Sequence, residues 1–170
     1  MAKVEKTRNQ IVKYRFSDIQ EVEYYCRNLS EEEQKHFDRR KLNVGFSLNV
    51  GGDLSQDKLD IGLRIIYKGT IQKVESEILK LDLLTVFQLK DYETKVSQNE
   101  DRSINIDDNL LISLLRIIIG TARGIIYTKT RGTFLNQFYL PIINVKALLD
   151  KIMLVEEDPH LQSKKIKRVS

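Results

Sequence analysis

Alternation of apolar and polar side chains marks the start of the chain as a strand. Apolar residues occupy every second position over Val12–Phe16, the phase slips around Asp18, and the alternation resumes from Val22. A period of two is typical of a half-buried strand. One extra residue at Ser17–Asp18, as in a β-bulge, explains the slip.

Three more segments have strand character. Alternation runs over Leu42–Val50 and again over Leu59–Tyr67, and Glu75–Lys90 predicts a further antiparallel strand. Gly51–Asp53 separates the first two of these segments and predicts a hairpin turn. Asp91–Arg102 predicts a polar loop.

A polar segment, Arg27–Arg40, joins the first strand to the second. Its composition predicts a long crossover connection, with one helical turn that Ser30 opens as the N-cap. Phe37 lies within this connection.

Two helices follow the strands. Asp107–Asp108 can cap a helix over Asn109–Lys129, and Asn144 can cap a second over Val145–Glu157. The polar residues of the long helix form one narrow stripe, at spacings of three and four: Ser113, Arg116, Gly120, Arg123 and Tyr127. The predicted fold is therefore α+β, a four-stranded antiparallel sheet followed by two helices. It occupies residues 11–157 as one domain, between a flexible N-terminus (1–10) and a disordered basic tail (158–170).

Outside its polar stripe, the long helix is apolar all round. It has more apolar surface than one small sheet covers. Two interpretations stay open: a deeply buried core helix, or a helix between subunits, where Gly120 and Gly124 would let a second backbone approach.

The net positive charge is confined to the tail. The chain has 28 Lys and Arg against 24 Asp and Glu, and residues 159–170 contain four basic and no acidic residues. Without them the count is 24 against 24, so residues 1–158 carry no net charge. Because a nucleic-acid-binding domain normally carries positive charge on its folded surface, the charge pattern argues against a nucleic-acid partner.

No segment predicts membrane insertion. The first ten residues lack the apolar core of a signal peptide, and the most apolar stretch, Leu110–Tyr127, contains Arg116 and Arg123 near its middle. The lone Cys26 excludes a disulfide framework. We expect a protein of the reducing cytoplasm.

Residues that support catalysis or bind metals are sparse. His36 and His160 lie 124 positions apart, and Cys26 has no obvious base beside it. A helix N-terminus explains the acidic pair Asp107–Asp108. The sequence predicts no enzyme, no metal and no cofactor.

Aromatic residues gather at element ends and in loops. One group, which precedes the second helix, consists of Phe134, Phe138 and Tyr139 with the apolar Leu140 beside them; Phe37 and Tyr24 lie elsewhere. These side chains either close the core or line an open groove for apolar segments of other chains.

Four short motifs in the second half are similar to a known family. In chain order they are Ala122-Arg123, Arg131-Gly132-Thr133-Phe134, Leu140-Pro141-Ile142 and Ala147-Leu148-Leu149. Their order and spacing resemble the C-terminal half of SecB, the bacterial protein-export chaperone family. The N-terminal half resembles SecB more loosely, through Asp18-Ile19, His36-Phe37 and the strand from Leu42.

The resemblance implies an ATP-independent holdase that binds unfolded preproteins in hydrophobic grooves, assembled as a homotetramer, a dimer of dimers. By position, the groove would be lined by Leu42, Val44, Phe46, Leu149 and Met153, with Phe37, Phe134 and Leu148 as neighbours. The long helix would lie between the dimers. The candidate interface residues are Leu114, Ile117, Ile118, Gly120, Thr121 and Gly124.

The family delivers clients to the export motor SecA through acidic residues of the outer sheet face and a C-terminal tail. Asp18 matches one such position, whereas Val22 and Lys80 fall near others, and the tail is basic. SecA coupling is therefore in doubt, and service to an antitoxin of a toxin–antitoxin module stays open. A scaffold for one folded partner, and nucleic-acid binding through the tail, are the competing hypotheses.

Overall fold

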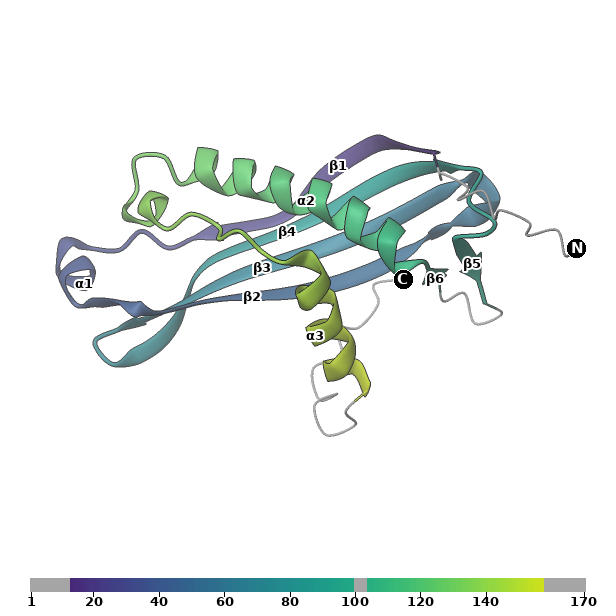
Figure 1. Cartoon of the computed structure of the whole chain (residues 1–170). Coiled ribbons are helices and arrows are strands. Elements are labelled where there is room, and N and C mark those ends of the chain that lie inside the picture. Colours follow the sequence, from purple (N-terminus) through teal and green to yellow (C-terminus); the bar gives the residue numbers. More distant parts are fainter. Residues whose placement is uncertain (1–12, 100–103, 158–170) are drawn as a thin grey trace, which may run out of the picture.

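A four-stranded antiparallel sheet forms the body of the molecule (Figure 1). The strands are β1 (Lys13–Cys26), β2 (Phe37–Asp53), β3 (Lys58–Ile71) and β4 (Val74–Lys90). Their order across the sheet is β1-β4-β3-β2, so β1 and β2 form the two edges. The computed structural model describes residues 13–99 and 104–157, with side chains up to residue 152.

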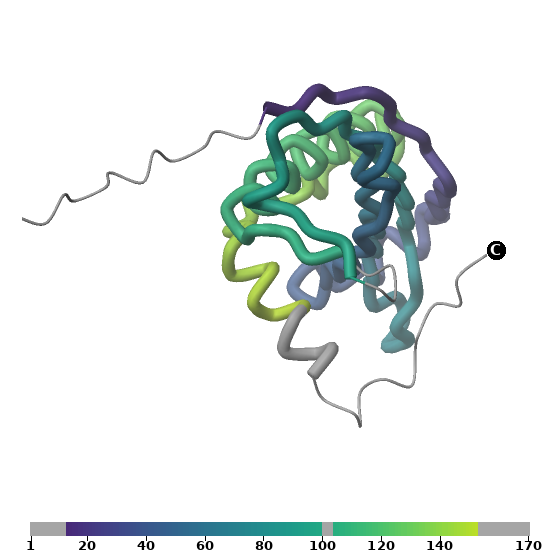
Figure 2. Tube along the Cα trace, turned by 90° about the vertical axis from the view of Figure 1, so that its right-hand side faces the viewer, coloured from purple at the N-terminus to yellow at the C-terminus, as the bar shows by residue number. Residues whose placement is uncertain are grey.

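The two long helices, α2 (Asp108–Lys129) and α3 (Val145–Glu157), lie on the same face of this sheet in Figures 1 and 2. The short α1 (Glu31–Lys35) belongs to the connection from β1 to β2. The predicted α+β architecture and both long helices are confirmed. The expected flexible N-terminus and basic tail lie outside the described residues.

β1 is irregular, as the slip in its pattern predicted. Its register with β4 shifts between Phe16 and Asp18, which confirms the bulge, and again between Glu21 and Glu23. Each shift inserts one unpaired residue and bends the strand.

The connection from β1 to β2 is shorter than predicted. Ser30 caps α1 through a capping box: its hydroxyl accepts from the Glu33 amide, and the Glu33 carboxylate accepts from the Ser30 amide. The strand then begins at Phe37, which the sequence analysis placed in the connection. A register shift between Asp38 and Asn43 interrupts the alternation there and hides the strand start.

The turn between β2 and β3 also differs from the prediction. Gly51–Asp53 is the paired end of β2, and the chain reverses at η1 (Leu54–Gln56) and Asp57, whose φ is +56°. Gly52 has a φ of +132°, and a Cβ there would lie 2.5 Å from the Lys58 carbonyl oxygen. Only glycine fits this backbone conformation and this close contact. Gly52 therefore ends the alternation of apolar and polar residues in the sequence, although the strand itself continues.

The predicted polar loop after β4 contains a small hairpin. Its strands are β5 (Val96–Gln98) and β6 (Ile104–Ile106), which pair antiparallel. Three-residue strands are too short for alternation to reveal them. The hairpin leads into α2, where Asp107 is the N-cap: its carboxylate accepts from the Leu110 amide and from Lys95, and the Lys95 hydrogen bond lowers the pKa of Asp107.

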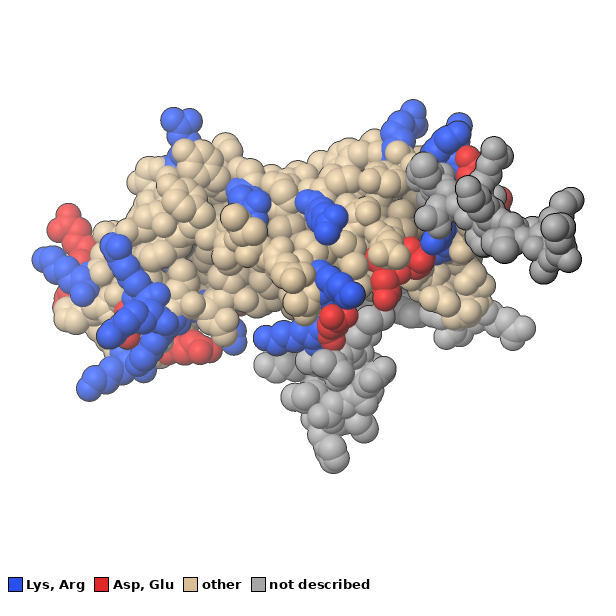
Figure 3. All heavy atoms as spheres, viewed as in Figure 1, with Lys and Arg blue, Asp and Glu red and all other residues tan. Residues whose placement is uncertain are grey.

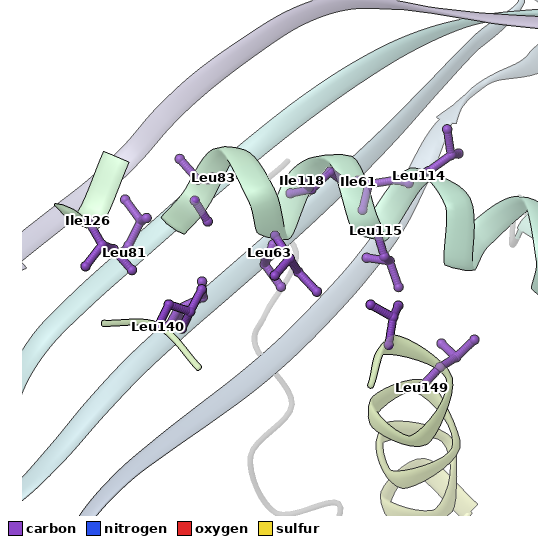
Figure 4. Packing of buried hydrophobic residues seen from close by; sticks show 14 of the residues in the cluster. Ile61, Leu63, Leu81, Leu83, Leu114, Leu115, Ile118, Ile126, Leu140 and Leu149 are labelled. Atoms are coloured by element: carbon purple, nitrogen blue, oxygen red, sulfur yellow. The ribbon is translucent and has the colours of Figure 1, made fainter. Parts of the chain in front are cut away.

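The core lies between α2 and the two inner strands. Figure 4 shows Leu114, Leu115 and Ile118 of α2 among Ile61 and Leu63 of β3 and residues of β4. The side of β3 that faces the helices is buried throughout; its apolar residues are Leu59, Ile61, Leu63, Ile65, Tyr67 and Ile71. The predicted polar stripe of α2 lies on the side away from the sheet.

By length and composition alone, α2 is apolar enough to cross a membrane. Half of its most apolar 18-residue window is buried inside the molecule, and the core helix of a globular domain passes the same test.

Gly69 of β3 accommodates the ring of Phe37, the first residue of β2. A Cβ built at Gly69 would overlap the Phe37 ring and lie 3.1 Å from Ile78 Cδ1. Phe37 is only 8% exposed, so its ring has little room to move away.

We predict that Gly69→Ala lowers the free energy of unfolding by about 1–3 kcal/mol, because it overpacks a buried contact. Gly51→Ala is the control, since nothing lies within 4 Å of a Cβ there. Urea denaturation of both variants checks this, and equal midpoints would contradict the packing described.

Candidate functional site

A row of half-buried apolar side chains runs along β2. It comprises Leu42, Val44, Phe46, Leu48 and Val50, which we call the apolar strip. Val44 lies opposite Tyr67 and Phe46 opposite Ile65 in the antiparallel register. Because those partners are buried, the strip lies on the face of the sheet that carries the helices.

The strip is half-exposed because of how the helices are placed. α2 packs on β4, and in Figure 1 it lies over the part of the sheet that is distant from β2. α3 packs on α2 and extends across β2 toward the free edge of the sheet. The strip therefore continues the apolar core outward, from under the helices to the edge.

Three aromatic rings close one end of this region. Phe37, Phe134 and Phe138 have their ring centroids 5.3–5.5 Å apart, and the Phe37–Phe134 pair is edge-to-face. Phe134 belongs to η2 (Phe134–Gln137), which follows the turn at Gly132, where φ is +79°. Phe37 is buried and Phe134 is half-buried, so these two predicted groove residues mainly close the core.

Arg123 fixes the segment that leads to α3. Its Nε donates to the Leu140 carbonyl (3.1 Å) and its Nη2 to the Pro141 carbonyl (2.9 Å). Leu140 is 3% exposed and packs in the core (Figure 4). The Ala-Arg and Leu-Pro-Ile motifs thus meet in space, and together they set where α3 starts.

Tyr67 lies beneath this region, opposite Val44. It is 1% exposed, and its hydroxyl has no hydrogen-bond partner among the residues the structure describes. Burial raises its pKa to about 12, so the hydroxyl stays neutral at physiological pH.

The predicted groove residues of α3 have different environments. Leu149 is 3% exposed and belongs to the core, whereas Leu148 is half-buried against it. The side chain of Met153 lies outside the described residues. Of the two whose side chains are described, Leu148 is the one with exposed surface.

The predicted interface residues divide between the two sides of α2. Leu114 and Ile118 are completely buried in the single chain, so they have no surface for another subunit. The remaining four lie on the outer side: Ile117 and Thr121 are half-buried, and Gly120 and Gly124 are exposed.

This outer side of α2 continues into an exposed apolar group. Tyr127 and Tyr139 are 48% and 64% exposed with ring centroids 6.0 Å apart, and Ile142 is 95% exposed. Figure 3 shows the middle of this face as a broad area with few charged side chains.

The opposite face of the sheet carries ion pairs beside the half-buried Ile66, Leu84 and Val86. Arg64 donates to both carboxylate oxygens of Asp82, with Nε–Oδ1 and Nη2–Oδ2 distances of 2.8 and 2.5 Å, and Lys80 pairs with Glu23 at 2.6 Å. The hydrogen bond to Asp82 raises the pKa of Arg64. Asp18 is exposed on this face, opposite Val86, and accepts from the Ile19 amide.

Two open depressions lie near β2. One of about 280 Å³ borders its middle; it is lined by Asn43, Gly45, Phe46, Ser47, Arg64, Ile66 and Lys68. One of about 510 Å³ lies near the start of β2; it is lined by Glu32, His36, Asp38, Lys41, Thr70, Gln72 and Lys73. Among the described residues no group of three or more His, Cys, Asp or Glu could hold a metal ion.

The sequence analysis missed part of the site. Leu48 and Val50 belong to the strip, although it was proposed only as far as Phe46, and Phe138 completes the aromatic group. The signal for Leu48 and Val50 was present, since the alternation extends to Val50. Phe138 had been noted but could not be placed opposite Phe37 from sequence.

Comparisons with known proteins support the fold. No family model and no curated protein matches the sequence. Among solved structures, the chain is similar to Rv1957, a SecB-like chaperone from Mycobacterium tuberculosis in complex with a ChAD peptide from the Rv1956 HigA1 antitoxin. The two chains are 9% identical with a TM-score of 0.54, over 77% of this chain and 91% of that one. The chain therefore has a SecB-like fold, as the sequence resemblance implied.

A second solved structure, a protein of unknown function from Streptococcus agalactiae, is 14% identical over 78% of this chain and 99% of that chain. Its TM-score is 0.30.

We predict that Arg123→Lys lowers the free energy of unfolding by about 1 kcal/mol and loosens the start of α3, because an ammonium group cannot reach both carbonyls with the guanidinium geometry. Amide hydrogen exchange over residues 140–149 checks this. Arg116→Lys, at an exposed position of the same helix, is the control; equal exchange in both variants would contradict the role given to Arg123.

Proposed function

We propose that this chain is a chaperone that binds apolar segments of unfolded polypeptides along the apolar strip, without ATP. The observation that carries the proposal is the strip itself: five apolar side chains in one row, half-exposed at the edge of a SecB-like sheet. The peptide-bound state of the similar chaperone Rv1957 supports it.

Burial of apolar surface supplies the binding energy. Full burial of a Val, Leu or Phe side chain contributes about 1.5–3 kcal/mol. The strip residues are already half-buried, so each contributes roughly 1 kcal/mol when a client covers it. Five such contacts support weak, reversible binding. A folded protein does not bind in this way, because its apolar segments are buried inside it.

We further propose that four chains assemble through the outer side of α2. The exposed Gly120 and Gly124 leave room for a second backbone, and the exposed Tyr127, Tyr139 and Ile142 lie close by. A homotetramer would present four strips to one client, and linked weak sites raise the overall affinity.

The proposed activity requires no catalysis, metal or cofactor. We propose that it takes place in the cytoplasm, on preproteins bound for export or on an antitoxin. The peptide in the Rv1957 structure comes from an antitoxin, which favours the second kind of client. The outer sheet face carries Asp18 among paired charges, where an acidic surface for SecA would be expected from the resemblance.

Client binding can be tested by dilution of a chemically denatured protein into buffer without ATP. We predict that the chain suppresses light scattering at stoichiometric amounts. Val44→Ser should weaken client affinity about fivefold, because it removes about 1 kcal/mol of apolar contact. Val22→Ser is the matched control, since Val22 is 61% exposed at the second irregularity of β1.

No suppression by the unmodified chain would rule out the chaperone function. Capture of a folded partner but of no unfolded polypeptide would instead identify a scaffold protein.

Assembly can be tested by the mass in solution. We predict a tetramer near four times 19.9 kDa, and a smaller species for Gly124→Leu, because the larger side chain would keep a second helix away. Lys146→Leu, at an exposed position of α3, should leave the mass unchanged. A monomer for the unmodified chain would contradict the proposed assembly.

A further inference from the structure

The start of β2 contains a bulge made mainly of cationic residues. Between two regular pairs of the ladder, residues 39–42 of β2 stand opposite the single Gly69 of β3. A strand with more residues than its partner bulges out of the ladder. The first three residues of this bulge, Arg39, Arg40 and Lys41, are consecutive cations, and all three are exposed. We call these three residues the cationic bulge.

The cationic bulge is held in place at its base. Phe37, which lies just before it, is 8% exposed and packs against two aromatic rings. The Asp38 carboxylate accepts a hydrogen bond from the Arg40 amide at 3.1 Å, and this bond lowers the pKa of Asp38. The Arg39 guanidinium lies 5.7 Å from the ring centroid of Phe138. The cations therefore extend from a backbone of defined shape and not from a fraying strand end.

A further cation lies across from the bulge, in the turn between β3 and β4. Gln72 and Lys73 form this turn, with φ angles of +50° and +69°. Residues with side chains such as these rarely adopt this backbone conformation, and such strain tends to accompany binding sites. Lys73 and Lys41 line the same depression of about 510 Å³. Two different parts of the sheet thus direct cations to one place.

Most of these cations have no carboxylate partner in the part of the chain that the structure describes. Of the ion pairs within residues 13–99 and 104–152, one joins Arg40 to Asp38 at 3.4 Å, and none involves Arg39, Lys41 or Lys73. The Arg40 side chain is 92% exposed, so water screens its pair with Asp38. Figure 3 shows Lys and Arg side chains gathered at the end of the molecule where β2 begins.

The chemistry of the depression favours carboxylates over a chain of phosphates. Glu32 and Asp38 also line it, and they would repel a nucleic-acid backbone, which carries a charge at every nucleotide. A polypeptide can place single carboxylates beside the cations and uncharged residues beside these two acids. Arginine in particular binds a carboxylate through two parallel hydrogen bonds. The chain's own tail does not suit the site, because residues 159–170 contain four basic and no acidic residues.

We propose that the cationic bulge and Lys73 form a docking site for an acidic segment of a partner protein. Carboxylates of that segment pair with Arg39, Lys41 and Lys73. The site lies outside the apolar strip and uses no apolar contact, so it is independent of the proposed client binding. It gives the chain a second surface, to which a partner can attach through charge alone.

The test measures the fluorescence anisotropy of a short labelled peptide, in which Glu alternates with Ser, during titration with the full chain. The peptide contains no apolar residue and therefore has nothing to place on the apolar strip. We expect binding that weakens about tenfold when the ionic strength rises from about 0.05 M to about 0.3 M, because exposed charges are screened by salt.

A pair of double variants locates the site. Arg39→Gln with Lys41→Gln should weaken the affinity for the peptide at least about fivefold, because two exposed ion pairs are lost. Lys58→Gln with Lys90→Gln is the matched control, since it removes the same charge from exposed positions at the other end of β3 and β4. Equal losses in both double variants would show that the peptide responds to net charge alone and would overturn the proposal.

A single-stranded RNA with as many negative charges as the peptide distinguishes the two classes of partner. We expect the RNA to bind more weakly than the peptide, because Glu32 and Asp38 repel its backbone. Tighter binding of the RNA, or no binding of the peptide at low salt, would overturn the proposal. Either result would leave the proposed client binding by the apolar strip intact.

Discussion

The packing of α2 on the inner strands is the contact on which the rest of the structure depends. One side of the helix is apolar throughout its length. The helix covers β4 and part of β3, but a single helix does not cover the whole width of a four-stranded sheet. Leu114, Leu115 and Ile118 are almost fully buried in this contact. A helix placed there stabilises the centre of the sheet and leaves β2 at the margin.

The candidate site is a consequence of this incomplete cover. The same alternation that buries one side of β3 continues on β2, where no long helix lies along the strand, so the apolar strip remains half-exposed. Arg123 then sets where α3 begins, by holding the carbonyls of Leu140 and Pro141. Core packing, the position of α3 and the exposure of the strip are therefore coupled through one helix.

Local pattern predicted most of the fold. The sequence pattern identified the four strands of the main sheet, and capping residues identified the helices: the side chains of Ser30, Asp107 and Asn144 each accept a hydrogen bond from a backbone amide as expected. The prediction was wrong at Gly51–Asp53, because a glycine required by close packing in a strand looks the same in sequence as a glycine in a turn.

The remaining features depend on contacts between residues far apart in the sequence. Phe37 belongs to the core because Gly69 and two later phenylalanines form a space for its ring, which no local pattern records. Helical periodicity likewise showed that α2 is apolar outside its polar stripe, but not which of those apolar residues face the sheet. Leu114 and Ile118 were consequently placed with the interface residues, although they lie in the core.

The central claim is that unfolded polypeptides bind on the helix-facing side of β2. The most direct measurement is the NMR spectrum of methyl groups during titration with a denatured client protein. The account predicts that the methyl signals of Leu42, Val44, Leu48 and Val50 shift, while those of Leu84 and Val86 on the opposite face of the sheet stay in place. Shifts confined to the opposite face, or no shifts at all, would contradict it.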